Sequence, residues 1–565
     1  MAHKSFIADI TNIVGSKNIL TKAHKTKRYR TGFRSGEGEA IAVVFPTSLL
    51  MQWQVLQACV KNDIVIIMQA ANTGLTEGST PNGNEYGRDV VILNTTRMDK
   101  IHVINDGKQV VALPGATLYN LEKQLLTYDR LPHSEIGSSC IGASIVGGVC
   151  NNSGGALIHR GPAYTELALF AQIHADGRVE LVNRLGIDLG QDAESMLKKL
   201  DDGLFDQNNI EQTDRLASDQ TYQDRVRNIN ADTPSRFNAD KDHLFETSGC
   251  AGKLVVFAVR LDTYGKNQRE QLFYIGTNSP NELSDIRKHI LSEMDNLPIL
   301  AEYMHKDIYE IAKKYGKDVF VIINLLGTSY LPMFFTLKGN LDAWFEKLGF
   351  LPKHFADKMM QFLSIFLPNL LPKKIENYRE KYNHYLMIKM ADDGIAELDG
   401  FLSEYFAKNQ QNQGEYYICP PKDSAKILLH RFVAAGSAVR YQAVHHQQVE
   451  EVIALDVALK RNEENWFETL PKEIEQQLSH KLYYGHFMCH VFHQDYIVKK
   501  GADTVKIKTQ MLEIFNQKGA EYPAEHNVGH VYKAKPDLAN FYQQLDPTNS
   551  LNPGIGKVSK LKFYK

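Results

Sequence analysis

The chain has 565 residues, of which 43% are hydrophobic and 23% charged, the balance of an ordinary folded protein. Its 64 basic side chains nearly cancel its 66 acidic ones, and the formal net charge of -2 excludes a globally basic nucleic-acid binder. A chain of this length exceeds a single hydrophobic core and should divide into two or more domains.

Cysteine usage and the hydropathy pattern point to a compartment. The six cysteines are scattered without a CxxC pair, which is a poor disulfide framework and indicates a reducing environment. Residues 1–20 mix charged and apolar side chains and do not predict a signal peptide, and no run of about 18 apolar residues predicts a membrane span. We therefore expect a protein of the cytoplasm or of the cytoplasmic face of a membrane.

The first half of the chain alternates short apolar runs with segments of helical spacing, an α/β or α+β pattern. The expected strands are 40–45, 64–69, 90–94 and 109–113, and the expected helices are 48–62 and 117–126. The polar stretch 195–245 should be a long surface excursion with some helix, and the strand 254–261 should close the first domain. A second α/β unit begins near residue 270.

Two glycine-rich loops bring backbone amides together without bulky side chains. One runs from Ala70 to Gly74 with Gly78 and Ser79; the other covers 137–144 and continues to 155. Amides beside glycine form concave nests that hold phosphate oxygens, although glycines that merely make turns would look similar. Neither loop is a GxGxxG or a GxxxxGK[ST] motif, which disfavours an NAD site and a P-loop.

The order and content of these loops resemble the FAD-binding domain of the vanillyl-alcohol-oxidase flavoprotein superfamily. Segments 69–81, 136–144, 150–155, 160–164 and 248–253 are similar to those of the quinone-dependent D-lactate dehydrogenases of Gram-negative bacteria, and the likeness extends over essentially the whole chain. The resemblance implies FAD held non-covalently. The flavin contacts that it implies are Ala70, Ala71, Asn72, Thr73, Gly74, Gly78, Ser79, Gly137, Ser144, Gly154 and Val256.

The resemblance also implies an α+β fold with a division of labour along the chain. A two-subdomain FAD-binding domain of the vanillyl-alcohol-oxidase type is expected at 1–268, and an α/β substrate (cap) domain at 269–337 and 391–520. A helical, basic, membrane-docking insert is expected at 338–390. The C-terminal segment 521–565, which is rich in Gly, Pro, His and Asn, is expected to return to the FAD domain.

Histidines gather in 484–493 and again in 525–530. Oxidation of a hydroxy acid needs a base for the hydroxyl proton, and a neutral imidazole suits this task near neutral pH. By resemblance to the related D-2-hydroxyacid dehydrogenases, His526 would be the base. In the same family pattern, a divalent metal such as zinc would be held by His486, His493 and Glu525.

The histidine segment departs from the family pattern in two places. Apolar residues with His490, at 487–490, replace a Gly-Asp-Gly-Asn turn, and Asn527 replaces a glycine. Seven residues along a straight strand span about 20 Å, so the backbone must bend for His486 and His493 to share a metal. The sequence leaves two readings open: a metal site, or histidines that are hydrogen-bonded in the core or at the surface.

An arginine is the usual clamp for a substrate carboxylate, because its guanidinium binds both oxygens. Arg431 aligns loosely with the arginine that has this role in the family, and Arg440 is a second candidate. An ordinary ion pair is the alternative for either residue.

The stretch 338–390 interleaves basic with large apolar side chains, a pattern typical of a helix in the lipid headgroup layer. Acidic residues within it weaken this pattern, and an amphipathic core helix would read similarly. Among quinone-linked members of the family, such a region docks on the inner membrane. No motif for nucleic acid accompanies the charge.

Together these features predict a respiratory flavoprotein, peripheral on the cytoplasmic face of the inner membrane and bound to anionic lipid. It would oxidise D-lactate to pyruvate on FAD and pass electrons to quinone. Another D-2-hydroxy acid as substrate is the nearest alternative. A metal-dependent hydrolase and a non-catalytic peripheral membrane protein are the others.

Overall fold

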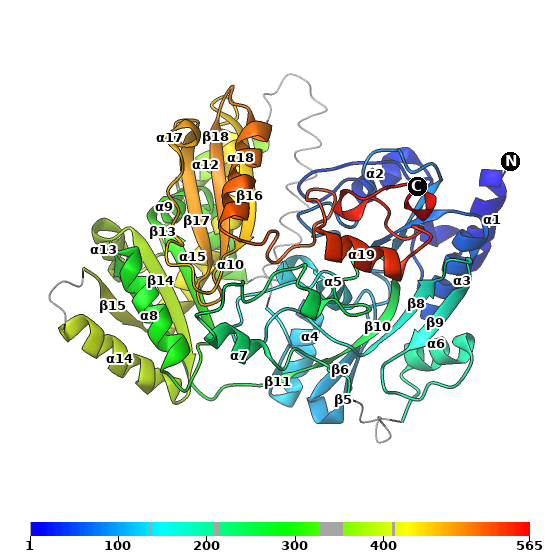
Figure 1. Ribbon diagram of the computed structural model, residues 1–565, viewed down its shortest axis with the longest axis horizontal. Coiled ribbons are helices and arrows are strands. Elements are labelled where there is room, and N and C mark those ends of the chain that lie inside the picture. The colour runs from blue at the N-terminus through cyan, green and yellow to red at the C-terminus, as the bar shows by residue number, and fades with distance from the viewer. Residues whose placement is uncertain (1, 136–137, 207–209, 211–213, 328–353, 409–412) are drawn as a thin grey trace.

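The computed structural model describes residues 2–135, 138–206, 210, 214–327, 354–408 and 413–565. Two lobes lie side by side (Figure 1): one holds both chain ends and the first eleven strands, the other is built on a single large sheet. The chain passes from the first lobe to the second after β11 (Tyr264–Gly265), since β12 (Glu270–Thr277) already belongs to the large sheet.

The first subdomain is a small sheet that presents the first glycine-rich loop. Strands β2, β4 and β3 run parallel and β1 is antiparallel at the edge, in the order β1-β2-β4-β3. Ser48 begins α3 by accepting a hydrogen bond from the amide of Met51, and α1 packs on α3. The bounds are α1 Ala2–Val14, β1 Ile19–Leu20, α2 Ala23–Arg30, β2 Ala42–Val44, α3 Leu49–Lys61, β3 Val65–Gln69 and β4 Val90–Asn94.

The second subdomain is an antiparallel sheet in the order β5-β6-β10-β8-β9, joined to a two-stranded ribbon of β7 and β11. The helices α4 and α5 pack on one side of this sheet through Leu121 and Ile145. The expected strands of the first domain and its two expected helices are thereby confirmed. The bounds are β5 Ile101–Ile104, β6 Gln109–Ala112, α4 Leu118–Leu125, β7 Arg130–Leu131, α5 Ile145–Cys150, β8 Ala168–Ile173, β9 Val179–Asn183 and β10 Val255–Asp262.

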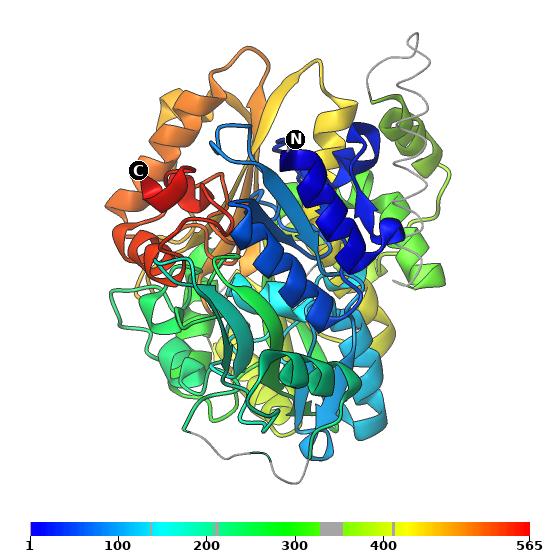
Figure 2. The same cartoon turned by 90° about the vertical axis from the view of Figure 1, so that its right-hand side faces the viewer.

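The second lobe is one seven-stranded sheet in the order β15-β12-β14-β13-β17-β18-β16, with every pair antiparallel. The α+β class is confirmed. The cap domain was expected to be α/β, but it is α+β as well, because every strand pair of its sheet is antiparallel and helices pack on both faces. Figure 2 shows the lobes from the side. The strand bounds are β13 Leu300–His305, β14 His384–Ala391, β15 Glu415–Cys419, β16 Val449–Ala458, β17 Leu478–His486 and β18 Val491–Lys499.

Helices cover both faces of the cap sheet. One face packs against α8, α14 and α18, and the other against α9, α10, α13, α15 and α16. The bounds are α8 Pro280–Ser292, α9 Lys306–Tyr315, α10 Lys317–Leu326, α12 Phe355–Ser364, α13 Lys373–Lys381, α14 Gly394–Lys408, α15 Pro421–Phe432, α16 Ala434–Val444, α17 Lys472–Glu475 and α18 Thr504–Gln517.

Part of the expected insert 338–390 falls on the cap sheet. Residues 338–353 lie outside the described residues, and α12 and α13 supply the expected helices after them. Residues His384–Ala391 instead form β14, which pairs with β12 and β13 near the middle of the sheet. Within the described ranges, no helix is both long enough and apolar enough to cross a membrane.

The C-terminal segment returns to the first lobe through α19 (Pro536–Leu545) and joins the edge of β3. The amide of Ile66 donates to the carbonyl of Ser550, and the amide of Asn552 donates back to Ile66, so Leu551 bridges Ile66 in parallel. The side chain of Asn552 also donates to the carbonyl of Gly78 at 2.9 Å. The last residues of the chain therefore support the first glycine-rich loop.

The stretch 195–245 contains α6 (Ala193–Asp202) and α7 (Tyr222–Arg227), but it is not only a surface excursion. His243 is buried between two carboxylates, with Nε2 at 2.6 Å from Asp219 and Nδ1 at 3.1 Å from Asp240. Burial opposes protonation, yet these carboxylates outweigh it and raise the pKa of His243 to about 9. Buried ion pairs of this kind fix the segment within the fold. They could not be predicted from its polar composition, which is also that of an exposed loop.

We expect His243→Gln to destabilise the protein by roughly 3 kcal/mol, because it leaves the buried carboxylate of Asp219 without its ionic partner, whereas Asp240 keeps Arg225. The folded-state pKa lies above the ordinary value of about 6.5, so this contribution is complete below pH 6.5 and is lost as the pH rises through about 9. Urea unfolding at pH 6 and pH 9.5 measures both effects. The exposed pair of His174 and Glu180 is the matched control, and His174→Gln should cost under about 1 kcal/mol. Equal losses in the two variants would contradict the prediction.

Candidate active site

The register of the cap sheet gathers polar side chains on one face at the ends of the strands. His493 on β18 lies opposite Asp456 on β16 and opposite Tyr484 on β17. His486, two residues beyond Tyr484, lies opposite Glu302 on β13. Because cross-strand partners project to the same side, all five side chains share one face.

A tight hairpin supplies the bend that the sequence did not reveal. Strands β17 and β18 pair directly up to His486 and Val491, with 487–490 as the turn between them. His490 adopts a positive φ of 54° and so takes a conformation that usually favours glycine. Its Nδ1 lies 3.1 Å from the carbonyl oxygen of Lys460, which makes it a buried structural histidine.

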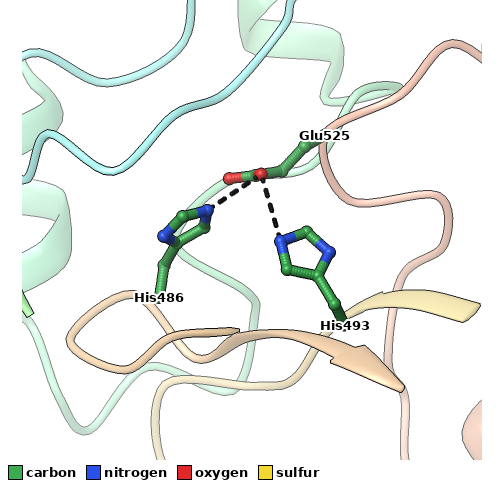
Figure 3. A group of neighbouring side chains, drawn as sticks. All are labelled: His486, His493 and Glu525. Atoms are coloured by element: carbon green, nitrogen blue, oxygen red, sulfur yellow. Dashed lines mark hydrogen bonds and ion pairs between the residues drawn. The ribbon is translucent and has the colours of Figure 1, made fainter. Parts of the chain in front are cut away.

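The hairpin brings His486 and His493 to within 5.4 Å between ring centroids, and both face the carboxylate of Glu525 (Figure 3). Oε2 of Glu525 lies 3.1 Å from His486 Nε2 and 3.7 Å from His493 Nε2. One ligand atom from each residue lies within 4.8 Å of the others, so the three can converge on a single ion. The three residues expected to hold a metal are therefore assembled in one place.

Each histidine of the triad has a second carboxylate behind it. Glu302 lies 2.6 Å from Nδ1 of His486, and Asp456 lies 3.3 Å from Nδ1 of His493. Histidines that bind metals usually have such partners, which fix the ring and leave Nε2 for the ion. Burial disfavours the charged ring, but Glu302 and Glu525 outweigh it and raise the pKa of His486 to about 10. The same negative field attracts a metal cation in place of the proton, so the donor set fits a divalent metal such as zinc.

His526 follows Glu525 and lies on the open side of the cluster, with its side chain 34% exposed. Its ring stacks at 6.4 Å on that of His493, and Nε2 lies 3.9 Å from Asp456. Burial lowers the pKa of His526, against the opposing charge of Asp456. The neutral ring, which can accept a proton, therefore predominates at neutral pH.

The two arginine candidates have different surroundings. Arg431 on α15 lies over the ring of Tyr484 at 4.7 Å and pairs with Glu302 at 2.8 Å, which places it in the cluster. Arg440 on α16 is held between Asp318 and Asp357, at 3.1 and 2.9 Å, among the helices of the cap. It is a structural ion pair, as the alternative reading for that residue expected.

The flavin residues expected from the sequence lie in several places. Gly137 lies outside the described residues. Ser144 begins α5 by accepting from the amide of Gly147 at 3.0 Å. Val256 is buried in the core of the antiparallel subdomain, where its carbonyl accepts from Gln52 at 3.1 Å. Gly154 lies against the catalytic cluster: a Cβ there would lie 2.5 Å from Oε1 of Glu525.

The first glycine-rich loop fits a nucleotide cofactor. Ala70, Ala71 and Asn72 line a cavity of about 550 Å³ together with Thr31 and Phe33. The amides of 71–74 donate no hydrogen bond to any described residue. A cavity edged by unpaired amides is suited to a diphosphate. The carbonyl of Thr76 in this loop accepts from His530, so the loop adjoins the segment that carries His526.

Three residues of the cluster were not predicted. Glu302 and Asp456 are lone carboxylates within apolar strands, and such isolated charges at core positions were a readable signal. Arg236 comes from the polar stretch 195–245 and donates both to Oε1 of Glu525 and to the carbonyl of Gly155. No sequence pattern marked it.

Known proteins resemble this chain over its whole length. A family model described as "D-lactate dehydrogenase, membrane binding" matches residues 272–564, and one described as "FAD binding domain" matches residues 40–181. The quinone-dependent D-lactate dehydrogenase of Escherichia coli K12 is 58% identical over 563 residues, covering 100% of this chain and 98% of the relative. That of Haemophilus influenzae is 52% identical and is covered over 100% of both chains. That of Corynebacterium glutamicum is 41% identical, covering 98% of this chain and 96% of the relative.

Solved structures support the fold alone, because their sequences are only 12% identical. p-Cresol methylhydroxylase superposes with a TM-score of 0.59 over 99% of this chain and 97% of that chain. Alkyldihydroxyacetonephosphate synthase superposes with a TM-score of 0.58 over 97% and 84%. Together with the family models, these matches confirm the vanillyl-alcohol-oxidase type of fold. The full-length relatives show an oxidoreductase, in place of the hydrolase and the non-catalytic protein considered from the sequence. The chain belongs to the family of quinone-dependent D-lactate dehydrogenases.

Proposed function

We propose that this protein oxidises D-lactate to pyruvate and passes the electrons to a membrane quinone. The observation that carries the proposal is full-length likeness, at up to 58% identity, to dehydrogenases with that name. A base, an arginine and a candidate metal triad support it; they gather where the C-terminal segment meets one face of the cap sheet, beside Gly154 of the second glycine-rich loop. FAD, when bound, supplies the acceptor for the hydride that leaves Cα of the substrate.

The chain's own residues have separate tasks in this reaction. Arg431 binds the carboxylate of the substrate and so fixes the orientation of Cα. His526 takes the proton of the 2-hydroxyl on its ring nitrogen, and Asp456 stabilises the charged ring that results. His486, His493 and Glu525 would hold a divalent metal, which would polarise the hydroxyl oxygen.

One spectrum tests the oxidation. The purified holoenzyme should show the visible absorption of oxidised flavin and should lose it when D-lactate is added without oxygen. L-lactate is the matched control for the stereochemistry. Protein that carries flavin and keeps its colour with D-lactate, but is bleached by another D-2-hydroxy acid, would move the proposal to that substrate. Protein bleached by none would end it.

Metal occupancy is a separate prediction. After dialysis against metal-free buffer we expect about one zinc per chain in the wild type and under about a tenth of that in His493→Ala, because two remaining ligands bind weakly. His490→Asn is the control: it changes a neighbouring histidine of the same turn and keeps a residue that tolerates positive φ. Elemental analysis gives the stoichiometry. Wild-type protein produced with zinc in the medium that retains none would contradict the prediction.

We further propose that the protein docks peripherally on the cytoplasmic face of the inner membrane, through the cap. Helix α12 packs against α10, and large apolar side chains are exposed along both. This apolar patch consists of Leu325, Leu326, Phe362, Leu363, Ile365 and Phe366, each 53% exposed or more. Basic residues adjoin it in sequence at Lys358, Lys373 and Lys374. An apolar patch with cations is suited to anionic lipid.

Replacing two residues of the patch should weaken docking. Ile365→Asp with Phe366→Asp puts two charges where apolar side chains would enter lipid, and we expect at least a tenfold loss of affinity for vesicles of anionic lipid. Sedimentation with vesicles measures it. Val505→Asp is the matched control, because Val505 is 74% exposed but lies on α18, on the opposite face of the sheet. Equal binding by the patch variant and the control would contradict docking through α12.

A further inference from the structure

Glu302 is a buried carboxylate in the middle of β13, with only 6% of its side chain exposed. Its neighbours in the strand, Ala301 and Tyr303, are buried in a hydrophobic cluster and offer its charge no partner. A buried charge is tolerated only when it is paired and hydrogen-bonded. Glu302 meets this need with two hydrogen-bonding partners on two different elements, the ring of His486 and the guanidinium of Arg431.

The two oxygens of Glu302 contact different residues: one contacts a histidine of the metal triad, and the other contacts the arginine proposed to bind the substrate. Oε1 lies 2.6 Å from Nδ1 of His486, and Oε2 lies 2.8 Å from Nη2 of Arg431. The first contact follows from the register, since Glu302 and His486 are direct partners across β13 and β17. The second reaches out of the sheet to α15. One carboxylate thus joins the hairpin to the helix that covers it.

The contact with Glu302 uses Nη2 of Arg431, whose side chain is largely buried, with 11% exposed. Arg431 has five N–H donors, and its Nε has no hydrogen-bond partner among the described residues. Its plane rests on the ring of Tyr484. With one Nη2 held by Glu302 and one face held by the ring, the remaining donors have a fixed direction. A carboxylate could bind them without Arg431 having to reorient.

We infer that Glu302 is a positioning residue that holds Arg431 and His486 in one fixed relation. The inference rests on the proposed oxidation of D-lactate. The contacts run from Arg431 through Glu302 and His486 to Glu525, the residue that precedes His526. Glu302 therefore sets the distance between the group that holds the substrate carboxylate and the group that accepts the hydroxyl proton.

The test replaces the charge and keeps the shape. In Glu302→Gln, an NH2 group replaces one of the two acceptor oxygens, so only one of the two partners keeps its acceptor. We expect the KM for D-lactate to rise about tenfold to a hundredfold, and the Kd for pyruvate to rise in parallel, with flavin content unchanged. Perturbation of the flavin absorption of the oxidised holoenzyme gives that Kd. Should Glu302→Gln not fold, Glu302→Asp keeps the charge but cannot reach both partners, and the same rise is expected.

Two comparisons separate positioning from general support of the fold. Asp318→Asn removes another buried carboxylate–arginine pair of the cap, with Arg440, and should leave KM within twofold even if it lowers the Tm as much. In an Arg431→Lys background, Glu302→Gln should add little further loss, because the two act through one contact.

The outcomes are distinct. Unchanged KM and Kd in Glu302→Gln, or an equal rise in Asp318→Asn, would overturn the role of Glu302 alone, provided that D-lactate reduces the wild type. A wild type that D-lactate does not reduce would overturn the proposed function, and the role of Glu302 with it.

Discussion

Replacing His526 with Ala is expected to slow reduction of the bound flavin by D-lactate about 1,000-fold, within the range that a general base contributes. The imidazole lies on the open side of the cluster, and partial removal from solvent lowers its pKa, so that the neutral ring predominates. Within the described chain Asp456 is its nearest ionic partner. With alanine in its place, the hydroxyl proton would have to leave to water. Anaerobic stopped-flow measurement of flavin bleaching gives the rate directly.

The control for this variant is its binding of flavin and of pyruvate, which does not depend on proton transfer. Among the described residues, His526 makes no hydrogen bond to the first glycine-rich loop, so flavin content and the Kd for pyruvate should stay within a few-fold of the wild type. A variant that binds flavin normally and is reduced at the wild-type rate would show that the proton is taken elsewhere.

The Gly154→Ala substitution is expected to lower the reduction rate by about 100-fold, although it adds a single methyl group. A Cβ at this position would lie 2.5 Å from Oε1 and 2.8 Å from Cδ of Glu525. The carboxylate cannot simply rotate away, because Arg236 holds Oε1 and His486 holds Oε2. Glu525 would therefore move together with the groups around it, and displacement of an active-site group by about 1 Å can cost this much.

Gly265→Ala is the matched control, because a Cβ at Gly265 meets nothing within 4 Å and its φ is not positive. It should leave the rate unchanged. Zinc content, measured in both variants, reports whether the triad has moved. Full activity of Gly154→Ala would mean that Glu525 has no fixed place in the reaction.

The fold was readable where a signal is local. Strands 64–69 and 90–94 are continuous apolar runs, as strands buried on both faces must be, and they proved to be β3 and β4. The order in which strands β12 to β18 pair within the cap sheet could not be predicted from the sequence, because that pairing joins residues far apart in the chain. Residues 384–390 were assigned to the insert because Lys389 and the apolar residues around it continue that composition, whereas their place is set by pairing with β12 and β13.

The site was readable by residue type and resemblance, but its assembly was not. No glycine marks the turn between His486 and His493 in the sequence, because His490 itself adopts the positive φ. Arg236 lies in a polar stretch whose burial depends on contact with Glu525 and Gly155, far along the chain in both directions. Only the folded structure brings such partners together.

The strand-like return of Ser550 and Asn552 to the edge of β3 has a consequence for biosynthesis. Ile66 is synthesised long before its partners Ser550 and Asn552, so this edge of β3 stays without them while the residues between are made. Domains otherwise fold in order from the N-terminus as the ribosome proceeds. Here the loop at Gly78 lacks the hydrogen bond from Asn552 until the C-terminal segment has been made, so the first subdomain cannot complete its fold before the cap domain has been translated.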